Sequence, residues 1–139
     1  MRNFRDLEVW QSSVLFVKKI YSITGSFPKE EKFGLVPQIN RCAVSIPSNI
    51  AEGCSRTSQK DFSRFLQISL GSAFELETQI EIAKEIGFVD VVLHLEIISE
   101  LNIIQKRIQS LKKYVDSQVI KQSPKPNTEH PKNDNTTTY

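Results

Sequence analysis

The stretch SIPSNIAEG, residues 45–53, places a proline inside a segment of helical periodicity that begins near Glu30. Apolar residues three and four positions apart give this segment one apolar face, formed by Ile39, Ala43, Ile46 and Ile50. Gly53 stands where a glycine is expected just past the end of a helix. The pattern therefore predicts a helix, the second along the chain, from about Glu30 to Gly53.

Pro47 has no backbone N–H, so in a continuous helix the carbonyl of Ala43 loses its usual donor. A proline in a helix interior costs roughly 3 kcal/mol and favours a kink. The alternative is that one helix ends at Ser45 and Pro47 takes the first position of another, where proline costs little. We favour a continuous second helix that is kinked at Pro47.

Three further segments have helical periodicity. They run from about Asp6 to Ile23, from about Ser58 to Gly87 and from about Asp90 to Val119. Ser58 with Asp61 three residues later resembles a capping box, which marks the start of a helix. Because no segment alternates like a strand, the sequence predicts an all-α fold, an antiparallel up-down-up-down four-helix bundle in residues 1–119.

The third and fourth helices each have one apolar stripe. The stripe of the third helix comprises Phe62, Phe65, Leu66, Ser69, Ala73, Leu76, Ile80 and Ala83. The stripe of the fourth comprises Leu93, Ile97, Leu101, Ile104, Ile108, Leu111 and Val115. The spacings of three and four suit helices packed side by side, so both stripes are predicted core faces.

The composition changes beyond Ile120, where the chain continues with three prolines and almost no apolar side chain. Such a segment cannot bury enough apolar surface to offset the entropy lost on ordering. We therefore predict a disordered polar tail, residues 120–139.

The composition of the whole chain fits one soluble domain, since 139 residues with 39% apolar side chains can form one core. The net charge of +2 is too small to indicate a nucleic-acid-binding protein by itself. The first residues are charged where a signal peptide needs an apolar region, and no apolar run approaches the roughly 18 residues that span a bilayer. We expect a cytoplasmic protein without a membrane partner.

The cysteines and histidines give no sign of a metal or redox site. Cys42 and Cys54 lack the CxxC spacing of such sites and are predicted to be reduced and structural. His94 has no glutamate at the i+3 spacing of a metal site in a helical bundle, and His130 lies in the predicted tail. No cofactor is expected.

The first helix differs from the others because it has two apolar stripes. One comprises Leu7, Trp10, Val14, Val17 and Tyr21, and the nearly opposite one comprises Val9, Phe16, Ile20 and Ile23. One bundle covers one stripe, and an apolar stripe left in water usually marks an association surface. The alternative is a helix buried on both sides within one subunit. We predict self-association through a subunit interface formed by Val9, Phe16, Ile20 and Ile23.

The polar side of the second helix comprises Arg41, Ser45, Ser48, Asn49 and Glu52. Arg41 and Glu52 are about 16 Å apart along a helix, so they cannot pair with each other. Asn49 and Glu52 are one turn apart and can share a hydrogen-bond network. We assign Arg41, Asn49 and Glu52 to a head-to-tail subunit interface that closes into a ring; the alternative is an ordinary solvated face.

Basic residues gather near the start of the third helix, where Arg56, Lys60 and Arg64 lie, and glutamates gather toward its end. This arrangement opposes the helix dipole, which favours acids at the start. Bases beside the free N–H groups of a helix start suit a phosphate. We predict phosphate contacts by Arg41, Arg56, Lys60 and Arg64, against the alternative that these charges only solubilise the helix.

Several strings together resemble the 23S rRNA intervening-sequence proteins, a family that includes the accessory variability proteins of diversity-generating retroelements. The strings are FRDLEVWQ (4–11), FP (27–28), EKFGLVPQINRCAVSIPSNIAEG (31–53) and GSAFELETQIEIA (71–83). The resemblance covers about the first 118 residues. It implies a four-helix protomer that forms a homopentameric ring, and for the accessory branch it implies binding to nucleic acid and to a reverse transcriptase.

Nothing in the sequence indicates catalysis, since there is no recognisable Ser-His-Asp set, glycine-rich phosphate loop or carboxylate–histidine metal spacing. We therefore expect a non-enzymatic protein that forms a homo-oligomeric, pentameric ring and binds RNA or DNA weakly without reading the base sequence. The alternative is a protein-interaction scaffold with no nucleic-acid role.

Overall fold

The computed structural model of the chain describes residues 2–122, and every long element in that range is a helix. The elements are η1 (Phe4–Asp6), α1 (Glu8–Thr24), η2 (Lys29–Phe33), α2 (Leu35–Cys54), α3 (Gln59–Glu85) and α4 (Val91–Gln122). The prediction of an all-α protein with four main helices is therefore confirmed, and no strand occurs within residues 2–122.

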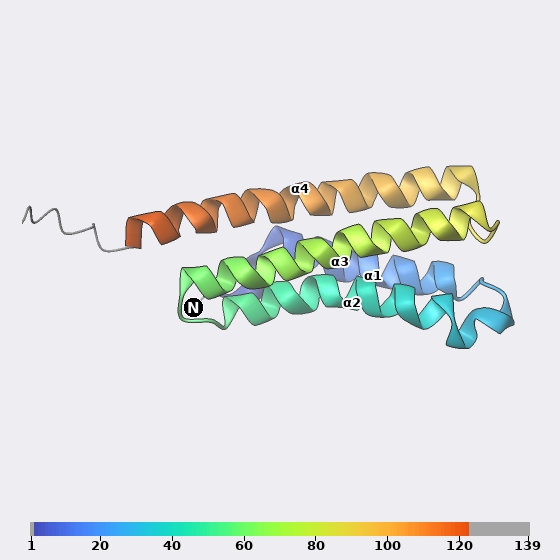
Figure 1. Cartoon of the computed structure of the whole chain (residues 1–139), viewed down its shortest axis with the longest axis horizontal. Coiled ribbons are helices and arrows are strands. Elements are labelled where there is room, and N and C mark those ends of the chain that lie inside the picture. Colours follow the sequence, from blue (N-terminus) through green and yellow to red (C-terminus); the bar gives the residue numbers. More distant parts are fainter. Residues whose placement is uncertain (1, 123–139) are drawn as a thin grey trace, which may run out of the picture.

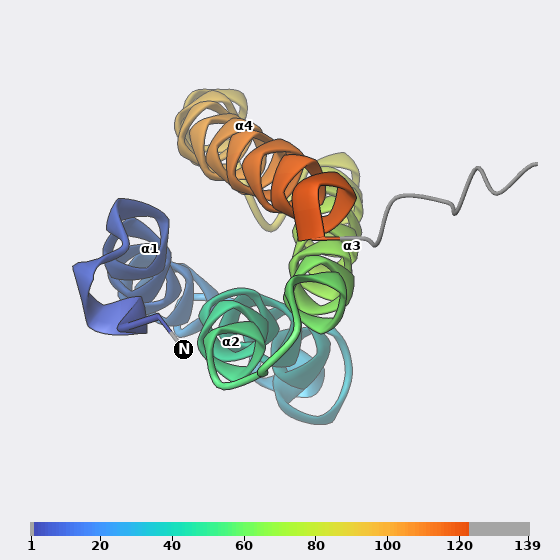
Figure 2. The same cartoon turned by 90° about the vertical axis from the view of Figure 1, so that its left-hand side faces the viewer.

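The four helices lie side by side along the long axis of the molecule (Figure 1). The α1–α2 and α3–α4 connections lie at one end, and the α2–α3 connection lies at the other. Seen end on, α2 lies between α1 and α3, and α4 lies next to α3 and extends across toward α1, with which it forms ion pairs (Figure 2). The N-terminal residues and the end of α4 are both near the α2–α3 connection, so this end collects chain segments that are far apart in sequence.

Side-chain caps fix the starts of α3 and α4. The Ser58 hydroxyl accepts the backbone N–H of Asp61 at 3.1 Å, as the sequence predicted. The Asp90 carboxylate accepts the backbone N–H of Leu93 at 2.7 Å. Between these helices, Gly87 has a φ of 85°, which only glycine adopts at little cost, and this residue allows the reversal from α3 to α4.

The predicted second helix does not begin near Glu30, because helical structure is interrupted between Glu30 and the start of α2. A 3₁₀ helix ends at Phe33, and α2 begins at Leu35, after Gly34 with φ −106° and ψ −108°. The Glu31 carboxylate accepts the backbone N–H of Leu35 at 2.9 Å and so caps the true start of α2. The sequence missed this break because a capping glutamate that precedes the glycine resembles one more helical residue.

The second helix runs through Pro47 without interruption, and Pro47 itself is buried. The prediction of one continuous helix is therefore confirmed over the alternative of two, whereas the kink remains a prediction. Carbonyls next to the proline receive extra donors. The Asn49 amide donates to the Ser45 carbonyl at 2.8 Å, and the Ser69 hydroxyl donates to the Ile46 carbonyl at 2.8 Å.

Gly53 lies inside α2 and not past its end, which corrects the prediction of a glycine stop. A Cβ atom at this position would lie 2.7 Å from Cδ2 of Phe62 and 2.9 Å from Cβ of Phe65. The glycine is therefore required for the close approach of α2 to α3.

The predicted core faces of α2, α3 and α4 are confirmed. All of their residues except Leu93 and Leu111 are buried, and the buried ones other than Phe65 and Ser69 join one hydrophobic cluster. Leu93 and Leu111 pack against that cluster. Residues from all four helices contribute, so the predicted stripes meet along the bundle axis.

The stripe of α1 assigned to the subunit interface faces the core. The other stripe is divided, since Leu7, Trp10 and Val17 pack against the core and only Val14 and Tyr21 are exposed. The four residues assigned to a subunit interface, Val9, Phe16, Ile20 and Ile23, are at most 9% exposed and belong to the core of the protomer. The outer apolar face of α1, formed by Val14, Leu15 and Tyr21, is 40–68% exposed instead. Contacts with the neighbouring helices decide which side of α1 faces the core. Because the two stripes are similarly apolar, the sequence does not show which one is buried.

The last helix extends to Gln122, so residues 120–122 of the predicted tail are helical. The rest of the predicted tail, residues 123–139, lies outside the described residues. In the described part of the chain, no helix combines the length and the apolar character that crossing a membrane requires.

Candidate functional site

The bases predicted at the start of α3 form a compact cluster around one aromatic ring. The guanidinium groups of Arg56 and Arg64 each lie 4.7 Å from the centre of the Phe65 ring. Lys60 lies between them in sequence and is exposed, with no ion-pair partner within residues 2–122. Three of the four predicted phosphate-binding residues are therefore brought together.

Arg2 adds a fourth positive charge that the sequence did not reveal. Its guanidinium lies 5.5 Å from the ring centre of Phe62 and 5.2 Å from that of Tyr114. The backbone N–H of Arg2 also bonds to the Cys54 carbonyl at 3.4 Å, which ties the start of the chain to the end of α2. We call Arg2, Arg56, Lys60 and Arg64 the basic end.

Two acidic residues offset part of this charge. Arg56 pairs with Glu52 at 2.6 Å, and Arg64 lies 3.7 Å from Asp61. All four side chains are well exposed, and ion pairs of this kind contribute only about 0–1 kcal/mol. A phosphate can therefore replace either carboxylate at little cost, and four bases against two acids leave the basic end positive.

The hydroxyls near the start of α3 are mostly occupied within the fold. The Ser58 hydroxyl caps α3, and the Ser55 hydroxyl donates to the Glu52 carbonyl at 2.6 Å. A small cleft of about 40 Å³ lies beside them and is lined in part by Arg2, Arg56 and Thr57. In this cleft Nε of Arg56 is buried without a hydrogen-bond partner in the described part of the chain.

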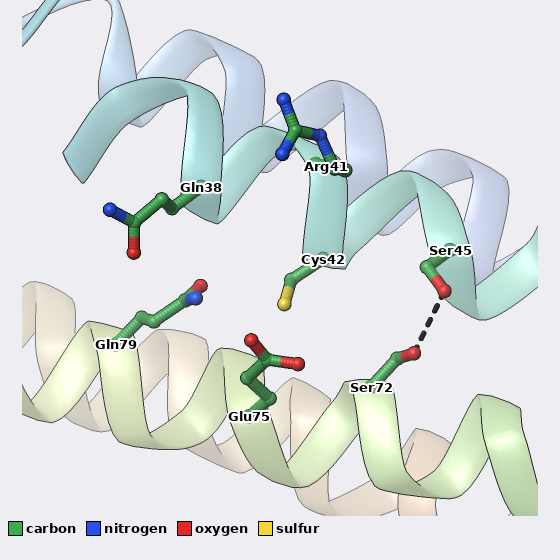
Figure 3. A pocket seen from close by; sticks show the side chains of 7 residues that line it. All are labelled: Gln38, Arg41, Cys42, Ser45, Ser72, Glu75 and Gln79. Atoms are coloured by element: carbon green, nitrogen blue, oxygen red, sulfur yellow. Dashed lines mark hydrogen bonds between the residues drawn. The ribbon is translucent and has the colours of Figure 1, made fainter. Parts of the chain in front are cut away.

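Arg41, the fourth residue in the predicted phosphate set, does not belong to the basic end. It precedes Arg56 by 15 residues on nearly the same helix, which is about 22 Å at the rise of an α-helix. It lies instead on the rim of a polar cleft of about 210 Å³ between α2 and α3 (Figure 3). This polar cleft is lined by Gln38, Arg41, Cys42, Ser45, Ser72, Glu75 and Gln79.

A chain of hydrogen bonds forms one wall of the polar cleft. The Asn49 amide donates to the Ser45 hydroxyl at 2.9 Å, the two hydroxyls of Ser45 and Ser72 are 2.8 Å apart, and the Ser72 hydroxyl donates to the Ile68 carbonyl at 3.1 Å. Because Ser72 uses its proton on that carbonyl, Ser45 is the donor between the two serines. All these protons are used within the protomer.

The expected network between Asn49 and Glu52 is absent, because the two side chains have different partners. Asn49 bonds to Ser45, whereas Glu52 pairs with Arg56. Of the three residues of α2 assigned to a subunit interface, Asn49 is half-buried and bonded inside the protomer, while Arg41 and Glu52 are exposed. The exposed pair lies on different parts of α2, so the predicted stripe is not one continuous surface feature.

The floor of the polar cleft contains a thiol that is held in its neutral form. Burial and the neighbouring Glu75 carboxylate raise the pKa of the Cys42 thiol to about 11. The thiol is therefore protonated near neutral pH and is a poor nucleophile. This cleft could not be predicted from the sequence, because its two walls come from α2 and α3 and helical periodicity does not specify their relative register.

Acidic residues dominate the opposite half of the bundle. Lys19 of α1 bonds to Glu96 at 2.7 Å and to Glu100 at 2.5 Å, so it is not available for a phosphate. The buried ring of His94 lies 2.6 Å from the Glu81 carboxylate. No group of three side chains suited to a metal ion occurs within residues 2–122. The protomer therefore has basic residues gathered at the α2–α3 end and more acidic residues toward the opposite end.

An apolar groove of about 380 Å³ lies between the start of α1 and the second half of α4. Leu7, Ile103 and Leu111 line it, and Ile103 is 50% exposed. Arg107 on its rim pairs with Glu8 at 2.9 Å. This groove and the outer apolar face of α1 both leave apolar side chains exposed.

Comparison with known proteins identifies the family. The family described as "23S rRNA-intervening sequence protein" matches residues 5–110, most of the chain. The chain belongs to this family.

One solved structure similar to this chain is that of a protein of unknown function from the S23 ribosomal protein family of Bacteroides thetaiotaomicron VPI-5482. Its TM-score is 0.71 at 28% sequence identity, over 76% of this chain and 95% of the other. The four-helix fold is thus shared along nearly the whole length of that protein. No curated protein sequence matches this chain.

Proposed function

We propose that this member of the 23S rRNA-intervening sequence protein family is a non-enzymatic cytoplasmic protein that assembles with copies of itself and binds nucleic-acid phosphates through its basic end. The observation that supports this function is the convergence of Arg56 and Arg64 on Phe65, with Lys60 unpaired beside them. Arg41 is left out of the proposed contact surface because it lies on the polar cleft.

The geometry favours contacts to phosphate over contacts to bases. Phe65 is only 9% exposed beneath the two guanidinium groups, so it offers no face on which a base could stack. The remaining groups are flexible cations, which neutralise phosphates without reading sequence. Binding is therefore expected to be weak, insensitive to sequence and strongly dependent on salt.

Assembly would compensate for the weakness of a single basic end. The proposed contact surface between copies is the outer apolar face of α1 with the groove beside Leu7, because both leave apolar area in water. The family resemblance implies five copies. A ring would present several basic ends to one nucleic acid, and binding at several sites raises the overall affinity without new contacts.

The experiment that tests this function measures binding of a fluorescent single-stranded RNA and DNA by anisotropy over a range of salt concentrations. The wild-type protein is expected to lose affinity steeply as salt rises, with no preference among unrelated sequences. The double variant Arg56→Glu, Lys60→Glu is expected to lose at least about tenfold in affinity at low salt while the assembly keeps its mass.

The matched control is Lys29→Glu with Lys32→Glu, which makes the same change in net charge at the opposite end of the bundle. This control is expected to bind nearly as well as the wild-type protein. Equal losses in the two double variants, or no binding at low salt, would contradict a nucleic-acid site at the basic end.

The second candidate function is a protein-interaction scaffold, which the large exposed apolar surface of α1 and α4 favours. For the accessory branch of the family, the resemblance implies a reverse transcriptase as the protein partner. A protein that stays bound to this chain after nuclease treatment, and is lost in a Leu15→Glu variant, would favour the scaffold over nucleic-acid binding.

A further inference from the structure

The polar cleft between α2 and α3 contains a hydrogen-bond acceptor that the fold leaves unused. Gln79 is only 7% exposed, and its Oε1 atom has no donor within the described part of the chain. Figure 3 shows its amide directed from α3 toward α2, beside Cys42 and Glu75. A buried amide oxygen without a donor is destabilising, so a ligand that donates a hydrogen bond here is bound favourably.

The same cleft carries two opposite charges that do not neutralise each other. Glu75 extends from α3 toward Cys42, and Arg41 extends outward from α2 (Figure 3). Neither forms an ion pair with any residue in the range 2–122, and the Glu75 carboxylate contacts the neutral Cys42 thiol instead. The anion therefore lies inside the cleft, whereas the cation lies at its rim with its guanidinium directed away from α3, so Arg41 contacts a ligand by turning toward the cleft (Figure 3).

The remaining polar side chains on the wall do not compete for a ligand. The protons of Asn49, Ser45 and Ser72 are used in the chain of hydrogen bonds that ends at the Ile68 carbonyl. These residues fix the distance between the helices. The groups left to bind are Gln38, Arg41, Glu75 and Gln79, from two helices that the hydrogen-bond chain holds together.

We propose that the polar cleft binds a small zwitterion with one ammonium and one carboxylate group, such as a free α-amino acid. The ammonium group donates to the Glu75 carboxylate and to Oε1 of Gln79, and the carboxylate accepts from Arg41. A plain cation would be repelled by Arg41 and a plain anion by Glu75, so a ligand with both charges fits best. The volume of about 210 Å³ restricts the ligand to a few heavy atoms beyond these two groups.

The test is saturation-transfer difference NMR on the full chain, which observes the ligand and is not limited by a large assembly. L-Alanine is the zwitterionic probe, and ethylamine and acetate each carry only one of its charges. The methyl group of L-alanine is expected to give a saturation-transfer signal whose dependence on ligand concentration reaches a plateau in the millimolar range. L-Alanine should bind with an affinity at least about tenfold higher than that of either single-charge probe.

The variants Glu75→Gln and Arg41→Gln are expected to weaken L-alanine binding at least about tenfold each, with unchanged helicity by circular dichroism. The control Glu85→Gln removes an exposed carboxylate from the same helix outside the cleft and is expected to bind normally. The proposal is overturned if L-alanine gives no signal, if ethylamine or acetate binds as well, or if Glu75→Gln binds like the wild-type protein.

Discussion

The hydroxyl of Ser45 on α2 lies 2.8 Å from the hydroxyl of Ser72 on α3. This bond joins the two strings that carry the family resemblance, residues 31–53 and 71–83. With the Asn49 amide on one side and the Ile68 carbonyl on the other, it forms a continuous series of hydrogen bonds across the interface between the helices. The polar residues around Pro47 therefore serve first to hold α2 against α3.

Removal of either serine hydroxyl is expected to destabilise the protein. Ser45→Ala and Ser72→Ala should each lower the free energy of unfolding by about 1 kcal/mol, because each leaves a half-buried partner with one bond fewer. The double variant should lose less than the sum of the two, with a coupling energy of about 0.5–1 kcal/mol. Urea unfolding of the four proteins measures this cycle, and additive losses would show that the two hydroxyls do not interact.

Gly53 is expected to tolerate no side chain. Gly53→Ala should lower the free energy of unfolding by about 1–3 kcal/mol, because the added methyl group would lie within 3 Å of Phe62 and Phe65. Gly71→Ala is the matched control, since nothing lies within 4 Å of its Cβ position. The control should gain up to about 1 kcal/mol from helix propensity. Similar effects at the two glycines would contradict the close packing of α2 on α3.

The outer apolar face of α1 is expected to be the surface that copies share. Leu15→Glu should keep the helicity of the monomer, because Leu15 is 68% exposed, but should lower the mass of the assembly. Gln67→Glu places the same charge on an exposed polar position of α3, away from this face, and should leave the mass unchanged. Phe16→Glu buries a charge in the core and should unfold the chain. Light scattering and circular dichroism separate these outcomes.

Stability toward acid is expected to depend on Asp116. The Lys112 ammonium group and the Ser63 hydroxyl hold the pKa of Asp116 below its ordinary value of 3.8. A carboxylate whose pKa is lower in the folded than in the unfolded state stabilises the fold at pH values above the unfolded-state pKa. This stabilisation is lost as the pH falls through the folded-state pKa. The free energy of unfolding of Asp116→Asn should therefore decrease less than that of the wild-type protein when the pH is lowered below 5.

The control for this acid dependence is Glu30→Gln, which removes an exposed carboxylate that has no ion pair in the described part of the chain. Its unfolding free energy should vary with pH as in the wild-type protein. If Asp116→Asn shows the same pH dependence as Glu30→Gln, the contacts of Asp116 do not contribute to stability.

The sequence predicted α3 and α4 well because each has one long apolar stripe, which leaves only one face to bury. It did not predict which side of α1 faces the core, because its two stripes are nearly equal and the neighbouring helices decide between them. It also placed Gly53 at a helix end, since glycine is common there and a close helix contact leaves no mark in local sequence.

The candidate site was predicted only where its residues are close together in the sequence. Arg56, Lys60 and Arg64 are close in sequence, so their cluster follows from helix geometry alone. Arg2 joins them only through the tertiary fold, and Arg41 is separated from them by most of α2. The polar cleft depends on how α2 and α3 are aligned, which periodicity does not determine.

Self-association is tested most directly by the solution mass of the natively purified chain at micromolar concentration, measured by light scattering after nucleic acid has been removed. The expected particle contains at least two copies of the 15.9 kDa chain, and five copies if the family resemblance holds. A single, monodisperse species of 15.9 kDa would contradict self-association, because the apolar surface of α1 and α4 would then need no second copy to cover it.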